Sequence, residues 1–543
     1  MADWPAWVRT LATRRRPKPW AAVLGDSRAL VWDRGAADGV PAAFAKIASD
    51  SSGARLATWV GEPASNHDPL AEAHSALEVA TALVGLAPSV SANVWQAALR
   101  KLLDLCQDAA GLEPGPVQAL AAVELPLTLA QAFPELALCQ PLTKPALRDL
   151  EQSLVSVLDS RGMPGASWWA DLPLLVASWT RSRKLSAAIG AAWPTEAESR
   201  WRALLPQLVR VIRPDRGQAV SGHAWQPRLL EALIETSASA RSQRLARENW
   251  GLSAADAESA RPPSPVSAAF ASEESQCAVL WSDWSPKAAR LTVAYAEREC
   301  RLDLSSGAVG LFRGAANPRL TIDGRPLALE SDWEQICWQS DADVDYLELE
   351  VDLSAGWRVQ RHLLLARRDR FLLLADAVLG ERPAGIEYEL ALPLGESQFQ
   401  SSSETTEGWI LSKRRQFSVL PLALPEWQSA ARGAGLSAVA ESLVYRASAR
   451  GQAMFAPLLF DLDSTRSRQP LTWRQLTVAA SRVIQKGDVA VGYRAQLGRQ
   501  QWMVYRSLGE RANRTLLGHN TAYEFVVGRF LRTGHVDTLL QIE

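Results

Sequence analysis

Apolar residues recur with two different periods along this chain of 543 residues. Between residue 68 and about residue 250 they fall three or four positions apart, which is the spacing of one helix face. From about residue 276 to the end they alternate with polar residues, as in strands that bury one face. The pattern predicts an α+β multidomain protein, in which an N-terminal α-helical domain is followed by a large antiparallel β-sandwich.

The helical half contains several segments with clear start signals. Asp68 and Pro69 form an N-cap and first-turn pair, and a second helix is expected to begin at Ser91. The second helix should bury Trp95, Leu99, Leu102 and Cys106. Further helices are expected over residues 145–159, 170–190, 197–212 and 226–247. Consecutive helices with short turns predict an incomplete α/α toroid, preceded by a short irregular or β-containing prelude over residues 20–62.

The β-rich half is clearest over residues 345–378, where three strands with short turns predict a meander. One side carries Leu347 and Leu349, and the other carries Glu348 and His362, so we expect the second side to face solvent. Residues 254–275 are rich in Pro, Ser and Ala and are predicted to form a linker. The predicted domains are therefore 1–253 and 276–543.

The charge balance excludes one class of partner. The chain has 58 Lys and Arg against 59 Asp and Glu, with a formal net charge of −1. A general nucleic-acid binder normally shows a basic excess or a basic stripe. We therefore expect no nucleic-acid partner. The sequence gives no indication of the oligomeric state.

Cysteine usage and apolar runs bear on cofactors and location. The five cysteines are odd in number and form no CxxC pair, so neither a disulfide framework nor a zinc site is predicted. Phosphate-loop and dinucleotide-binding glycine motifs are missing as well. We expect no metal and no cofactor. No apolar run approaches the roughly 20 residues of a membrane span, and the N-terminal stretch lacks a signal-peptide core. The expected location is cytoplasmic, without a membrane partner.

Four stretches resemble heparinase II/III-like polysaccharide lyases and the related alginate lyases. They are residues 157–181 and 211–235 in the helical half, and 278–295 and 362–380 in the β-rich half. The resemblance implies a helical toroid followed by a sandwich. It also implies an enzyme that cleaves uronic-acid glycans by β-elimination, so the expected partner is an acidic polysaccharide or oligosaccharide.

The catalytic motifs of that family are largely absent from this sequence. Elimination requires a group that neutralises the uronate carboxylate, a base, and an acid, often Tyr and His. Trp168 and Trp169 stand where the family shows Tyr-His, and the first tyrosine of the chain is Tyr295. Residues 296–307 contain no His, although the family places a His-containing motif there. We therefore expect elimination activity to be lost or altered.

The catalytic candidates that remain lie together in the sequence. His223 is the candidate base, and Arg213 or Arg216 is the candidate cation that neutralises a substrate carboxylate. His223 in a turn also fits a surface or helix-capping histidine.

The binding candidates are chosen for side chains that contact sugars. Aromatic faces stack on sugar rings, and amide and imidazole groups bind hydroxyls. The candidates are Trp168, Trp169, Trp225, Asn66 and His67. Any single Trp also fits core packing, and Asn66-His67 also fits an ordinary loop before a helix. The alternative function is therefore a non-catalytic glycan-binding or scaffold protein on the same architecture.

Overall fold

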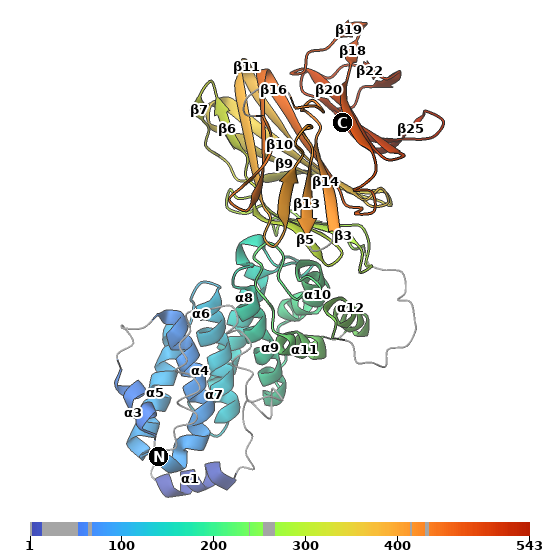
Figure 1. Cartoon of the computed structure of the whole chain (residues 1–543). Coiled ribbons are helices and arrows are strands. Elements are labelled where there is room, and N and C mark those ends of the chain that lie inside the picture. The colour runs from blue at the N-terminus through green and yellow to red at the C-terminus, as the bar shows by residue number, and fades with distance from the viewer. Residues whose placement is uncertain are drawn as a thin grey trace. The chain divides into compact units, whose positions relative to one another are not determined.

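The computed structural model divides the chain into two compact units, Met1–Glu258 and Ser259–Glu543 (Figure 1). Helices build the first unit and antiparallel strands build the second, so the predicted fold class is confirmed. The structure describes residues 3–13, 53–62, 68–237, 239–252, 267–412, 415–428 and 434–543.

The described part of the first unit is built from helices. The α-helices are α1 (Trp4–Thr13), α3 (Ala54–Gly61), α4 (Pro69–Leu86), α5 (Ala92–Asp108), α6 (Pro116–Gln118), α7 (Leu125–Ala132), α8 (Thr143–Val157), α9 (Leu172–Ile189), α10 (Thr195–Val211), α11 (Pro227–Thr236) and α12 (Ala240–Trp250). A π-helical stretch, Ala119–Glu124, links α6 to α7. Helix α4 packs on α7, and α8 packs on α10, which gives the curved helical array that the sequence predicted.

Two predicted helix starts are confirmed. The Asp68 carboxylate accepts a hydrogen bond from the Ala71 N–H at 3.3 Å, and Pro69 opens α4. The Ser91 hydroxyl accepts from the Val94 N–H at 3.4 Å at the start of α5. Such caps satisfy backbone N–H groups that have no partner within the helix. The predicted apolar stripe of α5 is buried.

Two other segments differ from the prediction. The part of the prelude that the structure describes forms helix α3, with Leu56 and Trp59 buried three positions apart. That spacing is helical, whereas the rest of the prelude lies outside the described residues. The single helix predicted over 226–247 is two helices, because the Ser239 hydroxyl accepts from the Ser242 N–H and starts α12 anew.

The second unit is built from antiparallel strands. They are β1 (Phe270–Ser272), β2 (Cys277–Trp281), β3 (Ala289–Ala294), β4 (Arg301–Ser306), β5 (Val309–Ala315), β6 (Arg319–Ile322), β7 (Arg325–Pro326), β8 (Glu334–Ser340), β9 (Val344–Leu353), β10 (Trp357–Ala366), β11 (Phe371–Pro393), β12 (Gln398–Ser401), β13 (Gly408–Ser412), β14 (Arg415–Pro421), β15 (Gly435–Val439), β16 (Ser442–Asp461), β17 (Leu471–Leu476), β18 (Val478–Ala480), β19 (Val483–Ile484), β20 (Ala490–Leu497), β21 (Gln500–Ser507), β22 (Arg514–Leu516), β23 (His519–Thr521), β24 (Phe525–Phe530) and β25 (Val536–Ile542).

These strands form stacked sheets with two main cores. The central sheet has the order β12-β13-β14-β16-β11-β10-β9-β8, with β6, β7 and β15 attached. The sheet β1-β2-β3-β4-β5 shares one core with one face of the central sheet. The C-terminal sheet β17-β20-β21-β24-β25 shares the second core with the opposite face. A small sheet, β19-β18-β22-β23, extends the C-terminal part.

The predicted meander is confirmed, but its predicted solvent-facing side is wrong. Strand β10 pairs with β9 on one side and with β11 on the other. Leu347 and Leu349 lie in the first core as expected. Tyr346 and Leu364 lie in the second core, and His362 is fully buried. The C-terminal sheet covers this face, which the alternation within the meander does not reveal.

A buried ion pair crosses the first core. The Arg361 guanidinium binds the Asp376 carboxylate at 2.7 Å, and neither side chain is exposed. The Tyr388 hydroxyl donates to the same carboxylate at 2.8 Å, and the Trp333 ring lies 5.0 Å from the guanidinium carbon. Buried charges are tolerated when they are paired and hydrogen-bonded in this way.

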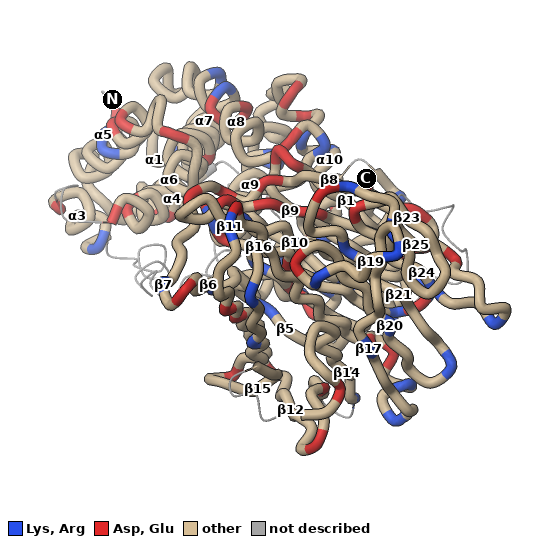
Figure 2. The backbone as a smooth tube through the Cα atoms, turned by 90° about the horizontal axis from the view of Figure 1, so that it is seen from above, with Lys and Arg blue, Asp and Glu red and all other residues tan. Residues whose placement is uncertain are grey.

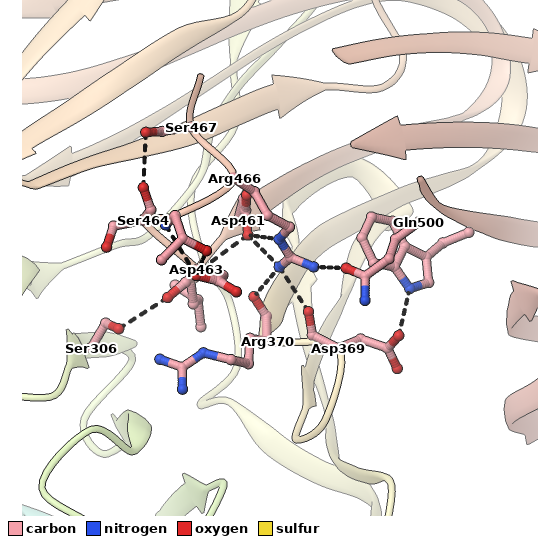
Figure 3. Close-up of polar contacts among 12 residues, drawn as sticks. Ser306, Asp369, Arg370, Asp461, Asp463, Ser464, Arg466, Ser467 and Gln500 are labelled. Carbon is pink, nitrogen blue, oxygen red and sulfur yellow. Dashed lines mark hydrogen bonds and ion pairs between the residues drawn. The ribbon is translucent and has the colours of Figure 1, made fainter. Parts of the chain in front are cut away.

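Arg466 makes a second polar tie between the central and C-terminal sheets (Figure 3). Its guanidinium pairs with Asp461 and donates to the carbonyls of Asp369 and Arg370 at 2.8 and 3.1 Å. The Trp502 indole N–H donates to the Asp369 carboxylate at 3.2 Å. Residues 369 and 370 form the turn between β10 and β11, so this cluster fixes that turn against β16 and β21.

The predicted linker is only partly described. Residues 254–266 lie outside the described residues, and β1 begins at Phe270, inside the segment predicted as linker. The domain boundaries therefore stay a prediction.

Charge and hydropathy do not single out one element. Acidic and basic positions are interspersed on both units in Figure 2, in keeping with the near-zero net charge. In the described part of the chain, Pro69–Ser89 is the one helical stretch long and apolar enough to cross a membrane. Its mean hydropathy is only 1.2 and 56% of it is buried, as in an ordinary core helix.

Candidate functional site

Two loops of the helical unit begin with the same backbone hydrogen-bond pattern. The first follows α8 and spans residues 158–171, and the second follows α10 and spans residues 212–225. In the first, Asp159 N–H donates to the Met163 carbonyl and Gly165 N–H donates to the Val157 carbonyl, both at 2.9 Å. In the second, the Arg213 N–H donates to the Gly217 carbonyl at 2.8 Å, and the Ala219 N–H donates to the Val211 carbonyl at 2.7 Å. We call these segments the loop pair.

A carboxylate closes each turn of the loop pair. The Asp159 carboxylate accepts from the backbone N–H groups of Arg161 and Met163, both at 2.8 Å. The Asp215 carboxylate accepts from the Gly217 N–H at 2.9 Å. Short side-chain carboxylates commonly stabilise turns by binding backbone N–H groups two residues onward. The shared hydrogen-bond pattern is a structural repeat with little identity in the sequence.

Gln218 joins the two halves of the loop pair. Its side-chain amide donates to the Trp169 carbonyl and accepts from the Trp225 indole N–H at 3.1 Å. Its backbone N–H donates to the His223 carbonyl at 2.7 Å. Gln218 is completely buried, so these bonds also satisfy its polar groups. Among the candidates, the structure thus brings Trp169, His223 and Trp225 together.

Asp171 completes the local charge arrangement. Partial desolvation raises the pKa of its carboxyl above the ordinary value, and the charge of nearby His223 lowers that pKa in part. The residue itself is exposed, just before α9. Asp171 therefore adds a negative charge to the surroundings of His223. Asp171 was not among the residues selected from the sequence.

The backbone of the second loop is strained beside His223. Arg216 and Val220 adopt positive φ values of 65° and 68°. Such values are costly for residues other than glycine, above all for a β-branched one, and they concentrate at functional sites. The Ser221 hydroxyl and His223 Nδ1 are buried and lack a hydrogen-bond partner within the described residues. Both polar atoms therefore remain available to a bound group or water.

The two arginine candidates differ in their surroundings. Arg213 forms an ion pair with Asp215 at 2.6 Å, and its side chain is 11% exposed. Arg216 is half-buried and has no carboxylate partner among the described residues. Arg216 is therefore the better placed of the two to meet an anionic ligand.

The tryptophan candidates differ in exposure. Trp169 and Trp225 are 3% and 2% exposed, and their indole N–H groups donate to the Pro164 carbonyl and to Gln218. In this structure their rings pack within the protein, because neither ring face is open to solvent. Trp168 is half-buried, so one ring of the adjacent Trp pair is partly accessible.

The candidates Asn66 and His67 lie outside the described residues. No three His, Cys, Asp or Glu side chains lie close enough to hold a metal ion in the part of the chain that the structure describes.

Sequence reasoning missed Gln218 and Asp171 for different reasons. Gln218 bonds to Trp169 across 49 positions, and no local signal marks a buried amide of this kind. Asp171 stands just before the Leu-Pro start of α9, a position that is typical of a helix cap, and this explains why it attracts no functional assignment.

Comparisons with known proteins identify the fold. No family model matches the chain. No curated protein sequence matches it either. Several solved structures do match. A crystal structure of heparinase III superposes with a TM-score of 0.66 and 11% identity, covering 93% of this chain and 95% of that one.

Two further solved structures agree with that match. A second heparinase III gene product gives a TM-score of 0.60 at 10% identity, covering 81% of this chain and 74% of that one. Heparan sulfate lyase HepC from Pedobacter heparinus gives 0.55 at 11% identity, covering 88% and 83%. At this level of identity the likeness concerns the fold. The chain therefore has the fold of heparinase III and heparan sulfate lyase, an α/α toroid-like helical unit followed by an antiparallel β-sandwich.

Proposed function

We propose that this protein binds an acidic polysaccharide through the loop pair, and that β-elimination is lost or altered. The observation that carries the proposal is the strained second loop, which has positive φ at Arg216 and Val220, presents the Arg216 guanidinium and holds His223 with its Nδ1 unpaired. A guanidinium binds carboxylate and sulfate groups well, and Trp168 offers a partly exposed ring. The shared fold supports this choice of ligand, because one similar structure is described as a heparan sulfate lyase and another as heparinase III.

Loss of elimination is supported by the composition of the helical unit that carries His223. A lyase needs an acid to protonate the leaving oxygen as well as a base. The helical unit contains no tyrosine and therefore supplies no phenolic acid. Removal of a general acid or base typically lowers the rate by about 10² to 10⁴. Glycan binding without turnover is therefore the expected behaviour.

Binding is tested with immobilised heparan sulfate. We expect the wild type to bind and to dissociate as salt is raised, since exposed ion pairs are screened. Trp168→Ala should weaken binding by about tenfold, the effect of losing roughly 1.4 kcal/mol of ring contact. Trp427→Ala is the matched control, because Trp427 is 64% exposed in the second unit and belongs to no candidate site. Equal weakening by both changes would contradict a role for the loop pair.

Turnover is tested by following the ultraviolet absorption of the unsaturated product. We expect little or no product from heparin, heparan sulfate, alginate or hyaluronan. Robust turnover that His223→Ala abolishes would show a working lyase with the assigned base. Turnover that survives His223→Ala would remove His223 from the mechanism. Absence of both binding and turnover across these glycans would favour the alternative, a scaffold protein on this architecture.

A further inference from the structure

A pocket of about 430 Å³ lies in the second unit, between the central sheet and the C-terminal sheet. Its walls come from β16, β17 and β20, from the loop 486–488, and from Pro383 on β11. Small-molecule sites commonly enclose about 300 to 1,000 Å³, so the space suits a single small ligand. We call it the β16–β20 pocket.

An irregularity in the central sheet lies beside this pocket. Leu379 pairs with Ala453, but the next pair is Ala384 with Gly451, so the β11 side has the longer stretch. Gly451 also makes room for the neighbouring loop, because a Cβ there would lie 2.6 Å from the Cβ of Asp488. Extra residues in one strand bend a sheet locally and often occur at binding sites. The pocket therefore depends on a specific backbone feature.

The floor of the pocket is aromatic and carries one phenol. Phe455 and Tyr493 line it with ring centroids 6.5 Å apart. Tyr493 is only 3% exposed, and burial raises the pKa of its phenol. The hydroxyl therefore stays protonated and can donate a hydrogen bond to a ligand in the pocket.

The rim of the pocket is polar and carries two cations. Arg450 and Lys486 are both exposed, and neither pairs with a carboxylate within the described residues. Asp488 accepts from the Gln452 N–H at 3.4 Å and can also accept from ligand hydroxyls. Gln475 adds a side-chain amide. Two cations against one carboxylate favour an anion, while the uncharged polar groups favour a ligand with hydroxyls.

We propose that the β16–β20 pocket binds one hexuronate unit, with its carboxylate between Arg450 and Lys486 and a hydroxyl on Tyr493. The volume fits one ring, the rim supplies the counter-charge, and the aromatic floor covers the apolar side of the sugar. The site is separate from the loop pair, which belongs to the other unit. It stands on the lining of the pocket and holds whether or not the loop pair binds polymer.

The test uses D-glucuronate, with D-glucose as the neutral analogue, and the full-length protein. Ligand-observed NMR titration should give weak but saturable binding of glucuronate and at least about tenfold weaker binding of glucose. Arg450→Gln, Lys486→Gln and Tyr493→Phe should each weaken glucuronate binding by about fivefold to tenfold. Arg474→Gln is the matched control, because Arg474 is an exposed arginine of β17 that does not line the pocket.

The possible results separate cleanly. Loss in the pocket variants with an unchanged control supports the proposal. The proposal is overturned if the wild type binds glucose and glucuronate equally well, or if it binds neither. It is also overturned if the pocket variants bind glucuronate as tightly as the wild type does. Circular dichroism of each variant checks that the fold is retained. Failure of this site is distinguishable from failure of the loop pair, because the pocket variants and Trp168→Ala change different units and are measured with different ligands, glucuronate and heparan sulfate.

Discussion

His362 is the centre of a buried polar chain in the second core. The Tyr346 hydroxyl donates to the Glu348 carboxylate at 2.8 Å and lies 2.8 Å from His362 Nδ1. A hydroxyl has one proton, and Tyr346 donates it in the hydrogen bond to Glu348. In the bond between Tyr346 and His362 the donor must therefore be the Nδ1–H of His362. The other ring nitrogen, Nε2, is buried without a hydrogen-bond partner in the described region. The imidazole is therefore held neutral.

This arrangement predicts that stability falls in mild acid. Burial, with a smaller contribution from Arg506, holds the pKa of His362 well below its ordinary value of 6.5. The unfolded chain gains a proton near that pH and the folded chain does not. The neutral His362 therefore makes its full contribution to the free energy of unfolding above pH 6.5. Below that pH the free energy of unfolding falls by about 1.4 kcal/mol per pH unit.

The measurement is the free energy of unfolding by urea between about pH 7 and pH 5.5. His362→Gln removes the titrating group, so its stability should decline less steeply than that of the wild type over this range. The difference between the two slopes isolates His362 from the carboxylates, which both proteins share. Parallel curves would contradict a neutral buried imidazole.

Single residues were predictable where their partners are local. Asp68 and Ser91 cap helices through N–H groups three positions away, and the sequence shows both partners at once. His362 was misplaced because its face of the meander is covered by strands more than a hundred positions onward, beyond the reach of periodicity. The bond from Gln218 to the Trp169 carbonyl likewise joins positions 49 residues apart.

At the scale of elements, hairpin turns show how backbone geometry is fixed despite the sequence. The β15–β16 turn consists of Ala440 and Glu441, with φ values of 44° and 62°. The β6–β7 turn has Asp323 and Gly324 at 47° and 78°. Two-residue turns of this kind match the twist of antiparallel strands, and Asn, Asp and Gly adopt them at the lowest cost. The Ala-Glu turn is therefore held by the pairing of β15 with the long strand β16.

Replacing that turn should stabilise the protein. The double change Ala440→Asn with Glu441→Gly removes two side chains that disfavour positive φ, and we expect about 1 kcal/mol of added stability in urea unfolding. Glu387→Gly is the matched control, because Glu387 is an exposed residue paired within β11 and glycine is unfavourable inside a strand. The control should lose stability. A loss in both proteins would contradict the turn assignment.

At the scale of the whole molecule, the order and period of the elements were sufficient to predict the architecture. Structures with only 10% to 11% identity share it, so the fold depends on pattern more than on particular residues. The number of stacked sheets was not predictable. A strand that is buried on both faces still alternates between apolar and polar residues when one of its faces carries hydrogen-bonded polar side chains. Catalytic activity depends on particular residues. The resemblance of the sequence to heparinase II/III-like lyases therefore predicted the fold better than it predicted the activity.

Limited proteolysis tests the division into two domains. Residues 254–275 are rich in Pro, Ser and Ala and have few large side chains to bury, which is typical of segments that proteases cleave. Since β1 begins at Phe270 and pairs with β2, we expect cleavage before that residue. The N-terminal fragment should be helical by circular dichroism and the C-terminal fragment should be β-rich. A single resistant core that spans the segment would contradict the boundary, because the two units would then be joined by packed chain.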